Sequence, residues 1–185
     1  PTEMLKGYIL TNVKDYDKIN ELNLLWKNQV SKLHSISFQE DIEFCKAWMR
    51  GIYAESIRQT SKGAENEDFE KIGTRFHTWV KDNYRQIGLR DSESFYYFVK
   101  SDFIFYSDIY IKVARSVSSF NAAYPELFLS SYWGIASSLS MPLLLAAINK
   151  SDDEITIDSK INAVSKFIDI YTITRTLYNR PITQT

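Results

Sequence analysis

Residues 92–117 read SESFYYFVKSDFIFYSDIYIKVARSV, and this stretch decides the fold. Its apolar residues recur at steps of three and four, which is the period of a helix. Further apolar residues lie on the flanks, so neighbouring elements should cover this helix on most of its sides. A helix of about 25 residues is about 38 Å long, enough to span a small domain. Its aromatic residues are Phe95, Tyr96, Tyr97, Phe98, Phe103, Phe105, Tyr106 and Tyr110.

The composition of the whole chain favours helices. Of its 185 residues 44% are hydrophobic and 24% are charged, which is usual for a globular protein. Aromatic residues reach 15%, which suggests a core filled by rings, and six Gly and four Pro are few for a turn-rich β fold. We therefore predict an all-α fold, an orthogonal multi-helix bundle around the long central aromatic helix. It should form a single helical domain over residues 1–185, and this domain is expected to be a fragment of a longer protein.

Helical patterns also precede and follow the central stretch. They predict helices over residues 1–11, 15–33, 37–52, 69–87, 126–138, 140–148 and 158–178. The polar residues 61–68 (SKGAENED) are expected to form a loop.

Local patterns predict how several of these helices begin and what they bury. Thr2 can cap the first helix, and Ser37 with Glu40 forms the Ser-x-x-Glu pattern of a capping box. Ser140 should cap a helix with Pro142 in its first turn, and residues 141–148 are apolar all round and should be fully buried. The last helix is expected to bury Ile161, Val164, Phe167, Ile168, Tyr171 and Leu177.

Charge and cysteine content limit the partners and the compartment. The net charge of −1 provides no overall field for nucleic acid or an anionic membrane, so such binding would need a local patch. Cys45 is the single cysteine, which excludes an internal disulfide and fits a reducing compartment. The most apolar run, residues 141–148, is far shorter than the about 20 residues of a membrane span. We expect a cytoplasmic protein with no membrane partner.

Few residues suggest catalysis or metal binding. His34 and His77 have no partner at the spacing of common metal motifs. The acidic residues Glu40, Asp41 and Glu43 fall in the first turn of a helix, where the backbone dipole favours them without any metal. No glycine-rich phosphate loop is present. The sequence therefore predicts no catalytic residue, no metal site and no cofactor in this chain.

Two surface or pocket hypotheses come from the residues alone. Lys71, Arg75 and Arg85 share the side of the 69–87 helix that is opposite its apolar side, so they could contact phosphate or form a solvated face. A ligand pocket could also form among four tyrosines, Tyr96, Tyr106, Tyr110 and Tyr132. The hydroxyls of buried tyrosines are, however, commonly hydrogen-bonded within the core, without any ligand.

Three segments together resemble one family. Residues 1–10 (PTEMLKGYIL) look like the segment after the Asn-Asp-Arg-Gly-like motif in the N-terminal domain of GmrSD-type restriction proteins. Residues 141–148 (MPLLLAAI) are similar to the buried proline-leucine-rich helix of that family. Residues 167–180 (FIDIYTITRTLYNR) look like its last helix.

The resemblance implies a role without catalysis. Family members join a ParB-like nucleotide-hydrolysing head, marked by Asp-Gly-Gln-Gln-Arg, to a helical body, and many add a C-terminal nuclease domain. This chain has neither the Asp-Gly-Gln-Gln-Arg motif nor the His-Asn-His cluster that marks the nuclease domain. It would be the helical body of a restriction or phage-defence protein, with the head and the nuclease domain as missing partners. A nucleoside triphosphate and a divalent metal would belong to the parent protein.

The same resemblance suggests contact residues. Glu3 and Lys6 match motif positions beside the nucleotide site of the family, although a solvated lysine on a terminal helix is the simpler interpretation of Lys6. Arg175 and Arg180 end the family-like last helix, and together with the basic residues of the 69–87 helix they are the candidates for DNA contact: Lys71, Arg75, Arg85, Arg175 and Arg180. A free-standing all-α protein-interaction module is the alternative to the GmrSD-like body.

Overall fold

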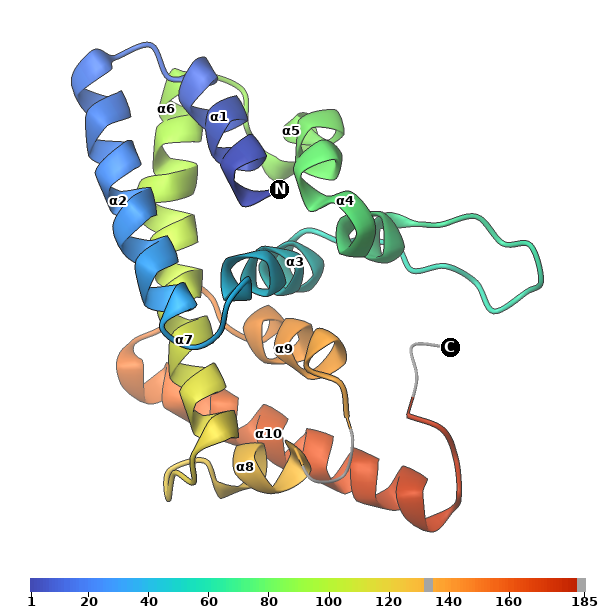
Figure 1. The fold of residues 1–185 in the computed structure, drawn as a ribbon. Coiled ribbons are helices and arrows are strands. Elements are labelled where there is room, and N and C mark those ends of the chain that lie inside the picture. The colour runs from blue at the N-terminus through green and yellow to red at the C-terminus, as the bar shows by residue number, and fades with distance from the viewer. Residues whose placement is uncertain (132–134, 183–185) are drawn as a thin grey trace.

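The computed structural model describes residues 1–131 and 135–182, and within these ranges the chain forms helices and loops with no strand. The predicted all-α fold is confirmed, and helices cross at steep angles around one long helix (Figure 1). In the described residues no helix is both long and apolar enough to span a membrane. The helices are α1 (Thr2–Asn12), α2 (Tyr16–His34), α3 (Glu40–Ile52), α4 (Asp68–Asp82), α5 (Tyr84–Ile87), α6 (Ser92–Tyr97), the π-helix η1 (Phe98–Phe103), α7 (Ile104–Ser118), α8 (Pro125–Ser131), α9 (Ser137–Ala146) and α10 (Glu154–Leu177).

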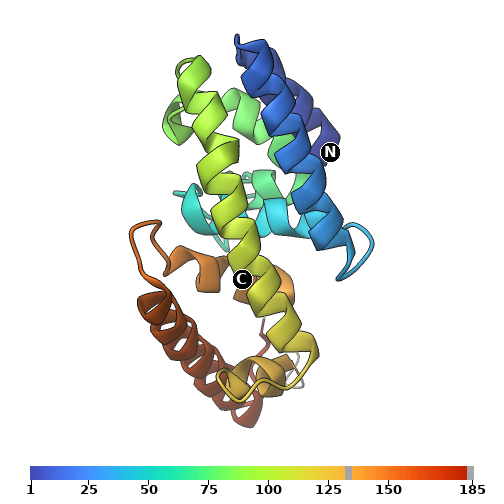
Figure 2. The ribbon, with the colours of Figure 1, turned by 90° about the vertical axis from the view of Figure 1, so that its left-hand side faces the viewer.

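The predicted central helix consists of α6, η1 and α7, which follow one another without a break (Figure 2). Most of its aromatic side chains are buried, as its pattern predicts. Tyr97 is an exception and is 55% exposed. In Figure 2 this long helix runs from the region of α1 and α2 down to α8 and α10, so it connects the two ends of the molecule.

The π-helical turn in the middle of this helix was not predicted. Phe98 and Phe103 are five residues apart, and their rings lie 4.9 Å and 6.0 Å from the ring of Trp48. In an α-helix, residues five apart point to different sides, whereas the i to i+5 bonding of a π-helix brings them close to one side. The π turn therefore lets both phenylalanines pack against the same tryptophan.

Trp48 is the centre of the aromatic core. Phe44 stacks on it at 5.6 Å, and Trp26 stacks on Phe103 at 4.2 Å. The indole nitrogens of Trp26 and Trp48 are buried and have no hydrogen-bond partner in the described part of the chain. Ring packing and burial, and not hydrogen bonding, therefore fix these two side chains.

Helices α3 and α9 cross at Gly51. A Cβ atom at this position would lie 2.6 Å from the carbonyl oxygen of Pro142, so only glycine allows this approach. The prediction that the helix begins at Ser140 is wrong, because Ala136 supplies the N-cap and α9 begins at Ser137. Pro142 consequently lies inside the helix instead of in its first turn.

Two predicted helix caps are also wrong. Gln39 (φ 73°), and not Ser37, precedes α3. The carboxylate of Glu40 accepts a hydrogen bond from the Tyr110 hydroxyl at 2.6 Å. In a capping box this carboxylate would instead have accepted a hydrogen bond from the backbone amide of Ser37. Thr2 lies within α1, where its buried hydroxyl has no partner in the described residues.

The predicted helix over residues 69–87 is interrupted. Arg75 has non-helical angles (φ −147°, ψ 65°), and Asn83 separates α4 from α5. The prediction of one basic face assumed an unbroken helical period, so it does not hold beyond the kink at Arg75.

The C-terminal helices also differ from their predicted limits. Helix α8 ends at Ser131 instead of residue 138, and residues 132–134 lie outside the described ranges. Helix α10 begins at Glu154, because the carboxylate of Asp153 accepts a hydrogen bond from the Thr156 amide at 2.8 Å and caps it.

Candidate functional site

The side of α10 that faces the protein is partly polar. Ile161, Ser165, Ile168 and Thr172 are buried and follow one another at helical spacing. The hydroxyl of Ser165 donates to the carbonyl of Asn162, and that of Thr172 donates to the carbonyl of Ile168. Local bonds thus satisfy the two hydroxyls, and this side contacts α8 and α9.

The opposite side of α10 is apolar and aromatic, yet it is exposed. Phe167 is 62% exposed, Ile170 66% and Leu177 80%. The prediction that Phe167, Tyr171 and Leu177 are buried is wrong, because no described element covers this side. We name it the α10 face, and it consists of Phe167, Ile170, Tyr171, Thr174, Leu177 and Tyr178.

Two hollows adjoin the α10 face and share Phe167 and Tyr171. The inner one has a volume of about 330 Å³ and lies between α9 and α10, with Leu143 on its α9 side. Leu143 is 48% exposed, so the expectation that residues 141–148 are fully buried is also wrong. The outer one, about 520 Å³, follows α10 from Phe167 to Arg180.

The segment after α10 folds back towards the inner hollow. Asn179 adopts a left-handed conformation (φ 52°), and the amide of Arg180 donates to the carbonyl of Arg175 at 2.8 Å. The guanidinium of Arg175 donates through Nε and Nη2 to the carbonyl of Pro181, at 3.0 and 2.7 Å. Ile182 then lines the inner hollow, so the chain itself supplies part of that wall.

Among the described residues, the charged side chains that line the two hollows are all arginines: Arg50, Arg175 and Arg180. Arg50 is held within the fold, since its Nε donates to the carbonyl of Phe69 at 2.9 Å and its guanidinium lies 4.1 Å from the ring of Phe69. Burial lowers the pKa of Arg50. Arg175 is half-buried in the last turn of α10, and Arg180 is exposed in the segment that follows the helix.

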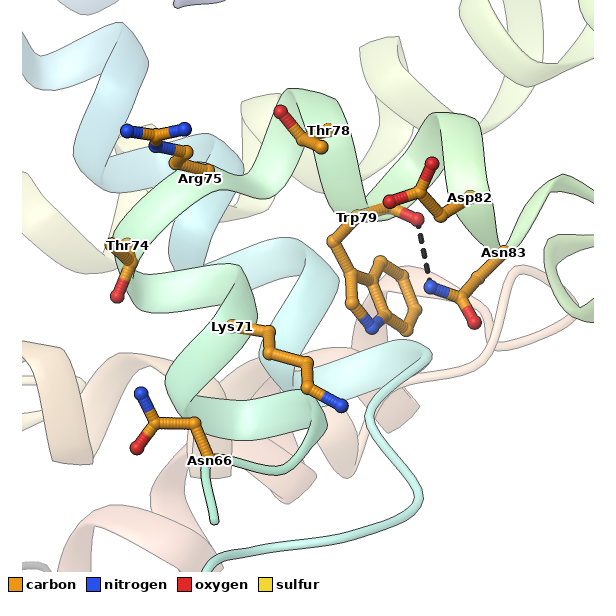
Figure 3. A pocket seen from close by; sticks show the side chains of 8 residues that line it. All are labelled: Asn66, Lys71, Thr74, Arg75, Thr78, Trp79, Asp82 and Asn83. Carbon is orange, nitrogen blue, oxygen red and sulfur yellow. Dashed lines mark hydrogen bonds between the residues drawn. The ribbon is translucent and has the colours of Figure 1, made fainter.

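The basic residues predicted on residues 69–87 do not form one site. Lys71 and Arg75 line a pocket of about 510 Å³ on α4, which also contains the carboxylate of Asp82. Figure 3 shows the side chains of Lys71 and Arg75 pointing in different directions, so they do not converge on one anion. Arg85 is absent from this lining; its Nε donates to the Tyr84 hydroxyl at 3.0 Å. Arg175 and Arg180 lie apart from this pocket, on α10 and its tail.

Glu3 and Lys6 lie on α1. Lys6 Nζ is 3.5 Å from a carboxylate oxygen of Glu3, one turn away. Lys6 is only 8% exposed, so it is not a solvated lysine, and its side chain packs into the fold. Glu3 is exposed.

The acidic side chains at the start of α3 form separate pairs with other groups. Asp41 lies 2.9 Å from His34, and Lys46 donates to Glu43 at 2.8 Å. The described residues contain no group of three side chains that could hold a metal ion. Cys45 is buried as predicted, and burial raises the pKa of its thiol, which keeps it protonated and unreactive.

The three described tyrosines of the predicted pocket do not share a site. The hydroxyl of Tyr96 donates to Glu21, that of Tyr106 to the carbonyl of Ile148, and that of Tyr110 to Glu40. Burial, followed by the hydrogen bond to Glu40, raises the pKa of Tyr110. Tyr132 lies outside the described residues. The hydroxyls thus serve three different contacts within the fold.

Comparison with known proteins adds no assignment. No family model, no curated protein and no solved structure matches this chain.

The α10 face is the surface that sequence reasoning missed. One signal was present: Ser165 and Thr172 share a side with Ile161 and Ile168, whereas Phe167 and Tyr171 fall elsewhere. At 3.6 residues per turn, the helix therefore has two partly apolar sides, and the larger side chains lie on only one of them.

Proposed function

We propose that this chain is a non-catalytic helical module that binds a segment of another protein through the α10 face. The arrangement of α10 supports this most, because it places Ser165 and Thr172 in the core and leaves Phe167 and Ile170 in solvent. Large contiguous apolar patches mark interaction sites. Aromatic residues and arginine are also the types enriched in protein interfaces.

The energetic argument concerns the exposed apolar area. Each Å² of apolar surface removed from water contributes about 25 cal/mol. A partner that covers Phe167, Ile170 and Tyr178 would remove three large side chains from water, none of which is less than 62% exposed. The folded chain alone gains little from these residues, whereas a complex would gain from each of them.

This function suits either a free-standing interaction module or the helical body of a larger protein. The GmrSD-like identity, with its restriction, phage-defence, nucleotide and metal chemistry, is a proposal supported by the three short sequence segments. One of these, residues 167–180, forms most of the α10 face and its tail. If the chain is such a helical body, a neighbouring domain of the parent protein would dock on this face. Cytoplasmic location belongs to the same proposal.

The experiment uses a library of displayed helical peptides that is selected on the purified chain. Two variants then test where the selected peptides bind: Phe167→Ser/Ile170→Ser on the α10 face, and Tyr16→Ser/Phe38→Ser as a matched control. Tyr16 and Phe38 are 75% and 84% exposed and lie on other elements. We expect the α10 variant to lose at least about tenfold in affinity, which is about 1.4 kcal/mol. Peptides that bind the α10 variant as well as the parent would refute the proposal.

DNA contact is the second candidate function. Lys71 and Arg75 line an open pocket and form no ion pair in the described part of the chain. The test is the salt dependence of DNA binding by a Lys71, Arg75 and Arg85 triple alanine variant. Each lost phosphate contact should lower the slope of log K against log salt by about 1. The control replaces three exposed cations elsewhere, Lys14, Lys27 and Arg115. Equal slopes in the two variants would show that the α4 residues are only solvated surface.

A further inference from the structure

Building on the proposed docking function, we propose that the partner segment is an amphipathic helix with acidic residues beside its apolar stripe. Three features of the α10 face support this: its spacing, its exposure and its charge.

The spacing of the α10 face fits a helix. Ile170 and Tyr171 lie three and four residues after Phe167, and Leu177 and Tyr178 lie three and four residues after Thr174. Position 178 lies eleven residues after position 167, a rise of about 16 Å or about three helical turns. Rows with this spacing are what a second helix packs against when its side chains interdigitate.

The exposure of the face argues against a small ligand. Pockets for small molecules bury about 70–90% of the ligand. Phe167 and Ile170 stand more than 60% exposed on the surface of a helix, so the outer hollow is a shallow groove along α10. The inner hollow is partly closed by Ile182, which leaves the outer groove for an external partner.

The charge of the face selects acidic residues. Arg175 and Arg180 line the outer hollow, and among the described residues no Asp or Glu lines either hollow. Arg175 now donates two hydrogen bonds to the neutral carbonyl of Pro181. A carboxylate is a stronger acceptor for a guanidinium and can bind it through two oxygens. Arg180 makes no side-chain hydrogen bond or ion pair in the described part of the chain, so its charge is open to a partner.

The same charges disfavour a second copy of this chain as the occupant. Arg175 and Arg180 line the outer hollow, and the described lining of both hollows contains no carboxylate. A second copy that docks through the same face would therefore bring more arginines and no acidic group to pair with them, which raises the free energy of that complex.

The experiment uses a second displayed library, with leucine fixed at steps of three and four and the flanking positions varied among Glu, Gln and Lys. We expect selection on the parent chain to enrich Glu at the flanks. Replacing both arginines, Arg175→Gln/Arg180→Gln, should lower the affinity for Glu-flanked peptides about tenfold and leave Gln-flanked peptides unchanged. Because Arg175 also holds the tail, Arg180→Gln alone is the second variant, with an expected loss of about threefold. Lys14→Gln/Lys27→Gln is the control of equal charge.

Each outcome decides a separate point. Enrichment of Lys or Gln, with binding that still depends on Phe167 and Ile170, would refute the acidic partner and leave the docking function intact. A dimer that light scattering detects in the parent but not in Phe167→Ser/Ile170→Ser would make a second copy the occupant and refute the proposal. If no selected peptide depends on the α10 face, both the docking function and this inference fail.

Discussion

The two longest helical stretches of this protein, α6–η1–α7 and α10, are both rich in aromatic residues, but they use them differently. In the central helix Phe103 is fully buried between Trp26, Phe44 and Trp48. In α10 the ring of Phe167 stacks on that of Tyr171, 6.2 Å away in the same exposed face, and on no other described ring. The same residue type is thus buried in the core in one helix and exposed to solvent in the other.

The difference arises from what surrounds each helix. The central helix contacts α2, α3, α8 and α9, so its flanks are covered. Helix α10 lies at one edge of the molecule and contacts α8 and α9 on one side (Figure 1). Burial, and not sequence period, therefore distinguishes the core helix from the helix with a free face.

The largest expected effect is that of removing the Phe103 ring. Phe103→Ala should lower the free energy of unfolding by about 3–5 kcal/mol, because the ring is fully buried among three aromatic residues and leaves a cavity. Urea denaturation followed by circular dichroism measures this. A loss below about 1 kcal/mol would contradict the role of this helix as the core.

The α3–α9 crossing should be next in sensitivity. Gly51→Ala should destabilise the protein by about 1–3 kcal/mol, because the new Cβ would meet the backbone of Pro142 at 2.6 Å. Gly7→Ala is the matched control, since a Cβ at Gly7 meets nothing within 4 Å. On the exposed side of α1, alanine should instead stabilise by up to about 1 kcal/mol. Equal melting temperatures for both variants would show that the crossing is loose.

The inner side of α10 should have a small dependence on pH. Burial, followed by the charge of Glu126, raises the pKa of Asp169. The folded state therefore holds this proton more tightly than the unfolded state, and stability falls as the pH rises through the raised pKa. Asp169→Asn should remove this loss and raise the melting temperature at pH 7 by about 1–2 °C.

The pH and salt dependence test the cause of that gain. The advantage of Asp169→Asn should disappear below about pH 4, where the parent carboxyl is protonated in both states. It should also shrink in high salt, which screens the repulsion from Glu126. A gain that is equal at pH 3.5 and pH 7 would exclude the charge as its source.

The smallest effect is expected on the α10 face itself. Phe167→Ala should change the free energy of unfolding by less than about 0.5 kcal/mol, because the ring is 62% exposed. Compared with Phe103→Ala, it separates the two uses of phenylalanine in one protein. A loss of 2 kcal/mol or more in the urea experiment would mean that Phe167 supports the fold and is not free for a partner.

The sequence predicts the fold better than the site. The central helix could be located because its period continues over 26 residues, so one local irregularity, the π turn, does not hide it. Short signals were less reliable. Glu40 has the spacing of a capping box, but the fold gives it the Tyr110 hydroxyl, a partner 70 residues away that no local pattern contains.

The α10 face could not be predicted for a similar reason. A helical period shows which residues share a side, but not whether another element covers that side. Phe167 and Tyr171 were assigned to the core because large apolar side chains are usually buried. The kink at Arg75 could not be predicted either, because Arg75 is neither a proline nor a glycine. Two residues before the kink, Gly73 packs against Arg50 of α3, a tertiary contact that no local pattern contains.

The π turn at Phe98–Phe103 has a consequence for how related chains would be aligned with this one. A π turn holds about one residue more than the α-helical turn that it replaces. A relative with a regular helix here would be one residue shorter, and its alignment would need a gap inside a helix, where gaps are normally disfavoured. Without that gap, every position of α7 would be paired with a residue from a different side of the helix. The equivalents of Asp108 and Tyr110 would then be missed, although both contact α2 or α3 in this protein.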